Sequence, residues 1–165
     1  MPVSSLKGKQ EIKEWFATQK DIKTILDVGP GSGTYQELLG SGYHWTAIEI
    51  WKPYVKKYGL NERYSKIIIG DVRKTKLPKA DCVIFGDVLE HMLKKDVYKV
   101  LKKAEKFKHM VVSIPVNSNS QYDNGNPYEK HISVWSEKNL RDTFKGFKQI
   151  FISNGVGCDM GVFLR

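Results

Sequence analysis

A glycine-rich turn follows the first apolar run of the chain, and it could bind a ligand through the backbone. The turn reads Asp27-Val28-Gly29-Pro30-Gly31-Ser32-Gly33. Glycines permit a tight turn and let backbone N–H groups approach a ligand closely. The third glycine lies four positions after the first, whereas the dinucleotide fingerprint G-x-G-x-x-G requires five. Asp27 could accept a hydrogen bond from an amino group or order the loop, but it would repel a pyrophosphate. The turn therefore argues against a nicotinamide-dependent oxidoreductase.

Carboxylates also follow three later apolar runs. Glu49 lies about 20 positions beyond the first glycine, where a carboxylate can accept two hydrogen bonds from ribose hydroxyls. Asp71, with the backbone of Val72, could read the edge of an adenine, although a lone Asp at a strand end is as often a turn former. Asp87 follows the small residue Gly86, which leaves room for a ligand. Ligands of open α/β sheets bind at such strand ends.

Short apolar runs alternate with helical patterns along most of the chain. This alternation predicts a doubly wound α/β fold, with a mostly parallel sheet and helices on both of its faces. Ser136, with Glu137 in the first turn, predicts the start of the last helix. The last two runs flank a polar loop at 153–157 and indicate an antiparallel pair at the sheet edge. The runs that predict strands are 24–28, 45–48, 66–69, 82–85, 110–114, 147–152 and 161–164, and the helical patterns cover about 8–20, 34–41, 52–58 and 94–107.

Length and composition predict a single domain over residues 1–165, with a helical lead-in inside residues 1–20. The chain has 41% hydrophobic residues, but no apolar stretch is long enough to cross a bilayer. The first ten residues do not resemble a secretory signal, so a cytoplasmic location is expected. The two cysteines, Cys82 and Cys158, are expected to be free thiols.

The formal net charge of +9 would favour association with a polyanion. Much of the excess is lysine in residues 94–108, where apolar residues recur at helical spacing and the lysines occupy the other faces. A solvated helix face explains this pattern better than a nucleic-acid surface. An RNA partner therefore stays possible but is less favoured.

Together, these segments resemble one family. The 27–33 turn, Glu49, Gly70-Asp71 and the segment Asp87-Val88-Leu89-Glu90-His91, in this order and spacing, are similar to class I S-adenosylmethionine-dependent methyltransferases over nearly the whole chain. The resemblance implies a seven-stranded, mostly parallel sheet with one antiparallel edge strand. It also implies S-adenosylmethionine as cofactor, S-adenosylhomocysteine as product, and no metal.

The resemblance also assigns roles to residues. Asp27 and the backbone of the glycine turn would surround the methionine part of the cofactor, and Glu49 would hold the ribose diol. Asp71 and Val72 would contact adenine, and Trp51 could cover it. The residues expected to bind the cofactor are therefore Asp27, Gly29, Pro30, Gly31, Ser32, Gly33, Glu49, Ile50, Trp51, Asp71, Val72, Gly86, Asp87, Val88 and His91.

His131 is the candidate general base. It lies in the loop that follows the fifth strand, and its ordinary pKa is near neutrality. The segment 129–136 resembles the approach to the last helix in methyltransferases that act on small metabolites and sugars. A structural histidine that fixes the loop is an equally good interpretation. Asp87 is expected to orient the acceptor.

Departures from related families leave the acceptor open. The segment Gly86-Asp87-Val88 stands where amino-methyltransferases of nucleic acids carry a Pro-Pro turn, and no Pro-Cys nucleophile is present, so methylation of DNA bases is disfavoured. The expected site lacks a cap, so it suits a bulky acceptor such as a glycan or a protein side chain, or a small acceptor enclosed by the 117–131 loop. A second subunit, including a second copy, could also supply the missing wall. The preferred function is methyl transfer to an O or N nucleophile of a small-molecule or sugar-like acceptor. The alternatives are an RNA methyltransferase and a non-catalytic cofactor-binding subunit.

Overall fold

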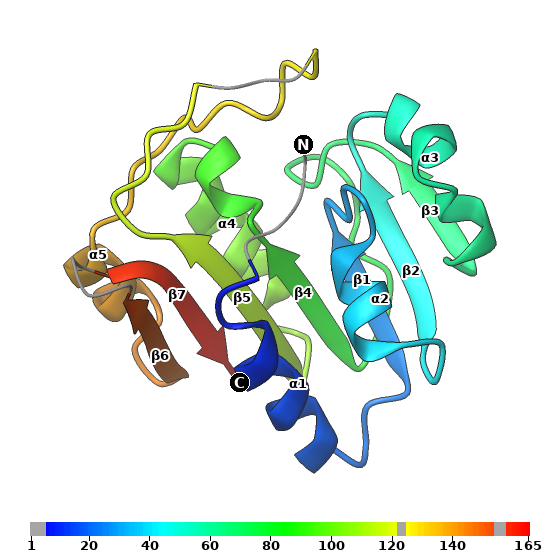
Figure 1. Cartoon of the computed structure of the whole chain (residues 1–165), viewed down its shortest axis with the longest axis horizontal. Helices are drawn as coiled ribbons and strands as arrows, with labels where there is room; N and C mark the ends of the chain where they lie inside the picture. The colour runs from blue at the N-terminus through cyan, green and yellow to red at the C-terminus, as the bar shows by residue number, and fades with distance from the viewer. Residues whose placement is uncertain (1–5, 122–124, 154–157) are drawn as a thin grey trace.

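The computed structural model describes residues 6–121, 125–153 and 158–165, except for the side chain at 158. Seven strands form one sheet, in the order β3-β2-β1-β4-β5-β7-β6 (Figure 1). The predicted runs are confirmed as strands, with ends that differ by up to three residues. The strands are β1 (Thr24–Val28), β2 (His44–Glu49), β3 (Lys66–Ile69), β4 (Cys82–Gly86), β5 (His109–Pro115), β6 (Lys148–Ser153) and β7 (Cys158–Leu164).

The pairing of the strands confirms the predicted doubly wound sheet. Strands β1 to β5 pair in parallel, and the order reverses between β1 and β4. Strand β7 runs antiparallel to both β5 and β6 and lies between them. The antiparallel pair is therefore at the edge of the sheet, as expected, with β6 as its outermost strand.

Helices cover both faces of the sheet (Figure 1). Ile12 and Phe16 of α1 pack with Tyr35 of α2 on one face. Val97 of α4 and Leu140 of α5 pack on the other. The helices are α1 (Lys9–Thr18), α2 (Thr34–Leu39), α3 (Pro53–Lys57), α4 (Lys94–Ala104) and α5 (Glu137–Thr143), with 3-10 turns η1 (Leu60–Glu62) and η2 (Leu89–His91).

Strand residues alternate between the two faces, and this alternation fixes the register. Val83 and Phe85 of β4 point into the core under α4 and α5, whereas Ile84 points to the opposite core. All three side chains are fully buried. A shift of one residue would exchange the two faces, so the packing holds the carboxyl ends of β1, β2 and β4 at the same edge.

Two sequence-based expectations outside the sheet can be compared with the structure. Ser136 caps α5 as expected, because its hydroxyl accepts a hydrogen bond from the backbone of Asn139 at 3.2 Å. Cys82 is a buried free thiol, and the side chain of Cys158 lies outside the described residues. Within the described ranges, none of the helices is long and apolar enough to cross a membrane.

The lysines of the 94–108 region have more varied roles than a solvated face would give them. Lys103 donates hydrogen bonds to the carbonyl oxygens of Val72, Arg73 and Thr75, at 2.8, 3.2 and 3.0 Å. Lys106 donates to the carbonyl of Leu77 at 2.6 Å. These two side chains fix the loop between β3 and β4 to helix α4. The prediction of a wholly solvated face is therefore wrong for them, because lysine stems can reach nearby backbone acceptors.

Candidate functional site

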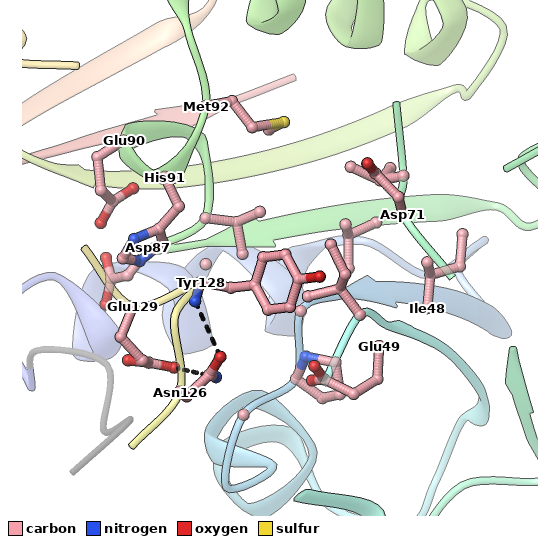
Figure 2. Close-up of a pocket in the computed structure, with 18 of the residues that line it drawn as sticks. Ile48, Glu49, Asp71, Asp87, Glu90, His91, Met92, Asn126, Tyr128 and Glu129 are labelled. Atoms are coloured by element: carbon pink, nitrogen blue, oxygen red, sulfur yellow. Dashed lines mark hydrogen bonds between the residues drawn. The ribbon is translucent and has the colours of Figure 1, made fainter. Parts of the chain in front are cut away.

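A cavity of about 340 Å³ opens at the carboxyl ends of β1, β2 and β4, below the loop that follows β5 (Figure 2). Its two sides have different origins. The strand side comprises Gly29, Pro30, Gly31, Glu49 and Asp71. The loop side comprises Glu90, His91, Asn126, Glu129 and His131. Asp87, at the end of β4, also lines the cavity. This position, beside the reversal of strand order, is where doubly wound sheets bind ligands.

The glycine turn on the strand side is shaped by backbone geometry. Gly29, Gly31 and Gly33 have φ values of 64°, 54° and 85°, in the left-handed region that favours glycine. At Gly29, a Cβ atom would also come within 2.7 Å of Val88. The N–H of Gly29 donates to the carbonyl of Ile48 at 2.8 Å, which ties the turn to β2. Backbone conformation and a backbone hydrogen bond thus hold Gly29 in place.

Side chains from below also support the turn. Arg63 donates a hydrogen bond to the carbonyl of Ser32, and it donates to Glu37 of α2 at 2.5 Å. Its guanidinium lies where a Cβ on Gly33 would be, with the nearest nitrogen 1.9 Å from that position. Ser32 and Gly33 consequently face Arg63 and do not line the cavity.

Asp27 lies beneath the turn and is fully buried. Its Oδ2 accepts a hydrogen bond from the hydroxyl of Tyr64 at 2.6 Å, and its Oδ1 has no hydrogen-bond partner in the part of the chain that the structure describes. Burial raises the pKa of Asp27 to about 6, although the Tyr64 hydrogen bond and the positive charge of Lys9 oppose this shift. Asp27 does not line the cavity, and its contacts match the ordering role foreseen for it more closely than direct ligand binding does.

Glu49 ends β2 and lines the strand side. Its Oε1 accepts a hydrogen bond from the backbone N–H of Trp51 at 2.7 Å, which points the carboxylate along the cavity wall. Burial raises the pKa of Glu49 to about 7, and hydrogen bonds from the backbone of Trp51 and Gly31 oppose the shift. A buried carboxylate at this strand end is well placed to accept hydrogen bonds from a diol.

Asp71 lines the cavity at the end of β3, but its carboxylate is already paired. Both of its oxygens accept hydrogen bonds from Arg73, at 2.7–2.9 Å. Lys103 holds the same loop from the other side. The loop that includes Asp71 and Val72 is therefore fixed before any ligand binds.

A chain of hydrogen bonds reaches Asp87 from helix α1 through the interior. The amine of Lys9 donates to the hydroxyl of Tyr35 at 2.5 Å, and this hydroxyl lies 2.6 Å from the Ser113 hydroxyl. Ser113 donates to Oδ1 of Asp87 at 2.9 Å. Because Ser113 gives its one proton to Asp87, Tyr35 must donate to Ser113. Lys9 is 5% exposed, and burial lowers its pKa, an effect that the negative charge of Asp87 opposes.

The backbone around Asp87 is also constrained. Asp87 has φ 54°, which is uncommon for a residue other than glycine. At Gly86, a Cβ atom would lie 1.9 Å from the ring of Tyr35. Glycine is thus required at 86 by the close approach of Tyr35, and the following Asp87 is held in a strained conformation that aims at the cavity. Strain of this kind is typical of functional sites.

The loop side brings together residues that are far apart in sequence. The backbone carbonyl of Glu90 accepts hydrogen bonds from the N–H groups of Ile132 and Ser133, at 2.8 and 3.0 Å. This contact places His131 beside η2, with 5.1 Å between the ring centroids of His91 and His131. The Nε2 atom of His131 lies 3.9 Å from Oε1 of Glu90. Burial lowers the pKa of His131 and raises that of Glu90.

The loop after β5 contributes a tight turn to the wall of the cavity. The side chain of Asn126 accepts a hydrogen bond from the N–H of Tyr128 at 3.0 Å and donates to Glu129 at 3.2 Å (Figure 2). The ring of Tyr128 lies inside the cavity in this view, between Glu49 and His91. The segment Asn126-Pro127-Tyr128 thus forms a turn, and Asn126 and Tyr128 line the site.

Most of the predicted site residues come together around the cavity. Trp51 does not line it; its ring centroid lies 6.0 Å from that of Tyr128, which does. Sequence reasoning did not assign Tyr54, Arg73, Glu90, Met92, Tyr128 or Glu129. The predicted residues that line the cavity are Gly29, Pro30, Gly31, Glu49, Ile50, Asp71, Val72, Gly86, Asp87, Val88, His91 and His131, whereas Asp27, Ser32, Gly33 and Trp51 do not.

Comparison with known proteins agrees with this arrangement. Residues 26–107, about half of the chain, match the family model described as a methyltransferase domain. The chain belongs to the class I S-adenosylmethionine-dependent methyltransferases. No curated protein matches the methyltransferase in a sequence comparison.

Solved structures show the same fold. An S-adenosylmethionine-dependent methyltransferase from Clostridium acetobutylicum has a TM-score of 0.71 at 12% identity, covering 98% of this chain and 91% of that one. Magnesium protoporphyrin IX methyltransferase from Synechocystis, with S-adenosylhomocysteine bound, has a TM-score of 0.68 at 14% identity, with coverages of 96% and 82%. Mitomycin 7-O-methyltransferase has a TM-score of 0.61 at 18% identity; this chain is covered to 96% but spans only 53% of that protein.

The cofactor of the methyltransferase is S-adenosylmethionine, and the residues of the strand side fit it. The cavity volume of about 340 Å³ is in the range of small-molecule sites. Gly29 and Gly31 present backbone without side chains to the cavity, and the buried carboxylate of Glu49 suits a ribose diol. The comparisons indicate no metal-dependent family.

Proposed function

We propose that this methyltransferase transfers the methyl group to an oxygen or nitrogen of a small-molecule or sugar-like acceptor. One observation carries the proposal: Asp87 and His131 line the same cavity as Glu49 and the glycine turn. Residues suited to the cofactor and residues suited to an acceptor therefore share one cavity. In this proposal, the strand side, with Val72, Gly86 and Val88, binds the cofactor, and the loop side binds the acceptor.

For methyl transfer, the main task of the protein is to orient the acceptor relative to the methyl group. Bound S-adenosylmethionine supplies a methyl group on a sulfonium, and the acceptor must approach that carbon in line. Asp87 accepts a hydrogen bond from Ser113, which orients its carboxylate at the cavity wall, where it can orient the acceptor. The Nδ1 atom of His131 faces the carbonyl of Ser118 at 3.3 Å. A carbonyl only accepts, so Nδ1 carries the proton and Nε2 has a lone pair that can take a proton from the acceptor.

A small acceptor is supported by the size of the cavity. Its volume is about 340 Å³, and Asn126, Tyr128 and Glu129 line it from the loop. Two proteins of the same fold are named for small-molecule substrates, mitomycin and magnesium protoporphyrin IX. An RNA acceptor has less support, because Lys103 and Lys106 are engaged with backbone carbonyls. A cytoplasmic location, a single domain over residues 1–165 and a second subunit stay predictions.

The test is a screen of acceptors with methyl-labelled S-adenosylmethionine. Purified protein is incubated with panels of sugars, phenols, amines and short RNAs, and labelled products are identified by mass spectrometry. We expect one class of small acceptor to gain a methyl group, and we expect Asp87→Ala to form less of this product. Cofactor binding without methylation of any acceptor would favour the non-catalytic alternative, and labelling of RNA alone would overturn the proposed acceptor class.

A further inference from the structure

We propose that Glu90, His91 and His131 form a site for a divalent metal ion of the zinc type on the loop side of the cavity. One ligand atom from each residue lies within 4.8 Å of the others. All three side chains line the cavity. The inference rests on the proposed function in one respect, because it places the ion where the acceptor would bind.

Hydrogen bonds at the far edge of each imidazole support this assignment. The Nδ1 atom of His91 faces the carbonyl of Lys130 at 3.1 Å, and the Nδ1 atom of His131 faces the carbonyl of Ser118 at 3.3 Å. Both Nδ1 atoms must donate, since a carbonyl cannot, and this leaves the lone pair of each ring on Nε2. Metal-ligating histidines usually donate their other N–H to a carbonyl or a carboxylate in this way.

Glu90 supplies a second, independent observation. Its side chain is 2% exposed, and its Oε2 atom has no hydrogen-bond partner among the described residues. A buried carboxylate oxygen without a partner costs free energy unless a ligand occupies it. The other oxygen, Oε1, faces Nε2 of His131 at 3.9 Å. An ion between Glu90 and the two imidazoles would satisfy the unpaired oxygen.

The donor set indicates which ion would bind. Two imidazoles and one carboxylate are a common ligand set of catalytic zinc, whereas magnesium prefers oxygen ligands alone. Three protein ligands would leave at least one coordination position open, and Asp87 lines the same cavity as the three ligands. The donors would move closer together on binding, because zinc–ligand distances are about 2.0–2.2 Å.

The ion would change the role of His131. With an ion on Nε2, His131 is a ligand, and the ion holds the acceptor's oxygen or nitrogen in its open position. The two roles make different predictions. If His131 acts as a base without an ion, proton transfer requires only His131. If an ion binds, holding the ion requires Glu90, His91 and His131 alike. The sequence gives no sign of such a site, because His131 lies 40 positions after His91.

The test measures metal binding directly, in protein without a histidine tag that has been treated with a chelator and dialysed. Zn²⁺ and Mg²⁺ are titrated by calorimetry, and Co²⁺ is followed by its visible absorption. We expect one Zn²⁺ per chain, a tetrahedral-type Co²⁺ spectrum and weak Mg²⁺ binding. Glu90→Gln, His91→Ala and His131→Ala should each weaken Zn²⁺ binding by more than about tenfold.

The matched control is His44→Ala, which removes an exposed histidine at the start of β2. It should bind Zn²⁺ like the unmodified protein. Thermal melts check that each variant is folded, and the partly exposed His91→Ala carries the test if the buried Glu90→Gln does not fold. The proposal is overturned if the unmodified protein shows no saturable Zn²⁺ binding, or if the three variants bind as tightly as the control.

The same samples separate this inference from the proposed function. If a small acceptor is methylated in the presence of chelator and Zn²⁺ does not bind, the ion site is wrong and the function stands. If Zn²⁺ binds with the expected loss in the variants and no small acceptor is methylated, the ion site stands and the function is wrong. If both are right, a chelator should lower turnover and Zn²⁺ should restore it.

Discussion

The strand side and the loop side of the cavity are built on different principles. On the strand side, each residue follows directly from the end of its own strand, and local contacts fix it, such as Gly29 to Ile48 and Glu49 to Trp51. On the loop side, two segments 40 positions apart meet through the backbone of Glu90. Substitutions on the loop side can change which acceptor binds without disturbing the sheet. The geometry of the strand side would stay the same. Cofactor binding and acceptor choice should therefore respond to different substitutions.

The largest effect should come from His131→Ala, which acts on the loop side alone. We expect kcat to fall by about 10²–10⁴-fold, the usual contribution of a positioned proton-transfer group or of a lost metal ligand. The dissociation constant of S-adenosylmethionine should change by less than about twofold, because the strand side is untouched. Steady-state kinetics and calorimetry measure the two quantities. A comparable loss of cofactor affinity would show that the two sides are not separable.

Glu49→Gln, on the strand side, should lower the affinity for the cofactor. Loss of a charge-assisted hydrogen bond to the ribose should weaken binding of S-adenosylmethionine by about 10–100-fold, since such bonds contribute about 1.5–3 kcal/mol. Glu129→Gln, on the loop side, is the matched control and should leave the cofactor affinity within about twofold. Titration calorimetry with S-adenosylhomocysteine provides the measurement. Equal effects of the two variants would contradict the division of the cavity.

The carboxylate of Glu49 should make cofactor binding depend on pH. The pKa of Glu49 is raised to about 7 in the free protein, and its ionised form is the better acceptor for ribose hydroxyls. Affinity should therefore rise with pH and level off above about pH 8. At pH 6, one unit below this pKa, binding should be about tenfold weaker. In Glu49→Gln the profile should be flat, and a rise that persists in this variant would assign the titration to another group.

The smallest effect is expected from Lys103→Met, which keeps the apolar stem and removes the three hydrogen bonds to the loop between β3 and β4. We expect the cofactor affinity to fall by about threefold, because the loop loses its pre-organisation. The melting temperature should fall by a few degrees. The control is Lys102→Met, whose exposed side chain pairs with Glu105. If both variants behave alike, the hydrogen bonds of Lys103 do not pre-organise the loop.

The elements of the fold could be predicted from the sequence because each signal is local. Short apolar runs bounded by turn formers marked all seven strands, and Ser136 marked the start of α5. The glycine turn and Glu49 were predictable for the same reason, since both follow directly from a strand. Family resemblance supplied their roles, which stay predictions.

The loop side could not be predicted in the same way. Glu90 stands inside a recognised segment, but nothing local shows that its side chain would be buried next to His131. The support of the turn by Arg63, and of Asp87 by Lys9, depends on contacts between helices and strands that the periodicity of one segment does not encode. Trp51 was predicted from the sequence to bind the cofactor, but it does not line the cavity. Tyr128, from a distant loop, lines the cavity and was not predicted.

The charge of the cavity differs in sign from that of the whole chain. Five carboxyl groups line it, from Glu49, Asp71, Asp87, Glu90 and Glu129, against one guanidinium, that of Arg73, which pairs with Asp71. The chain as a whole carries a formal net charge of +9. S-adenosylmethionine has one positive charge more than S-adenosylhomocysteine, so the local field should attract the substrate more than the product. Association of the substrate should then slow as salt is added, whereas association of the product should hardly change. The acidic lining would in this way help each turnover to end with release of the spent cofactor.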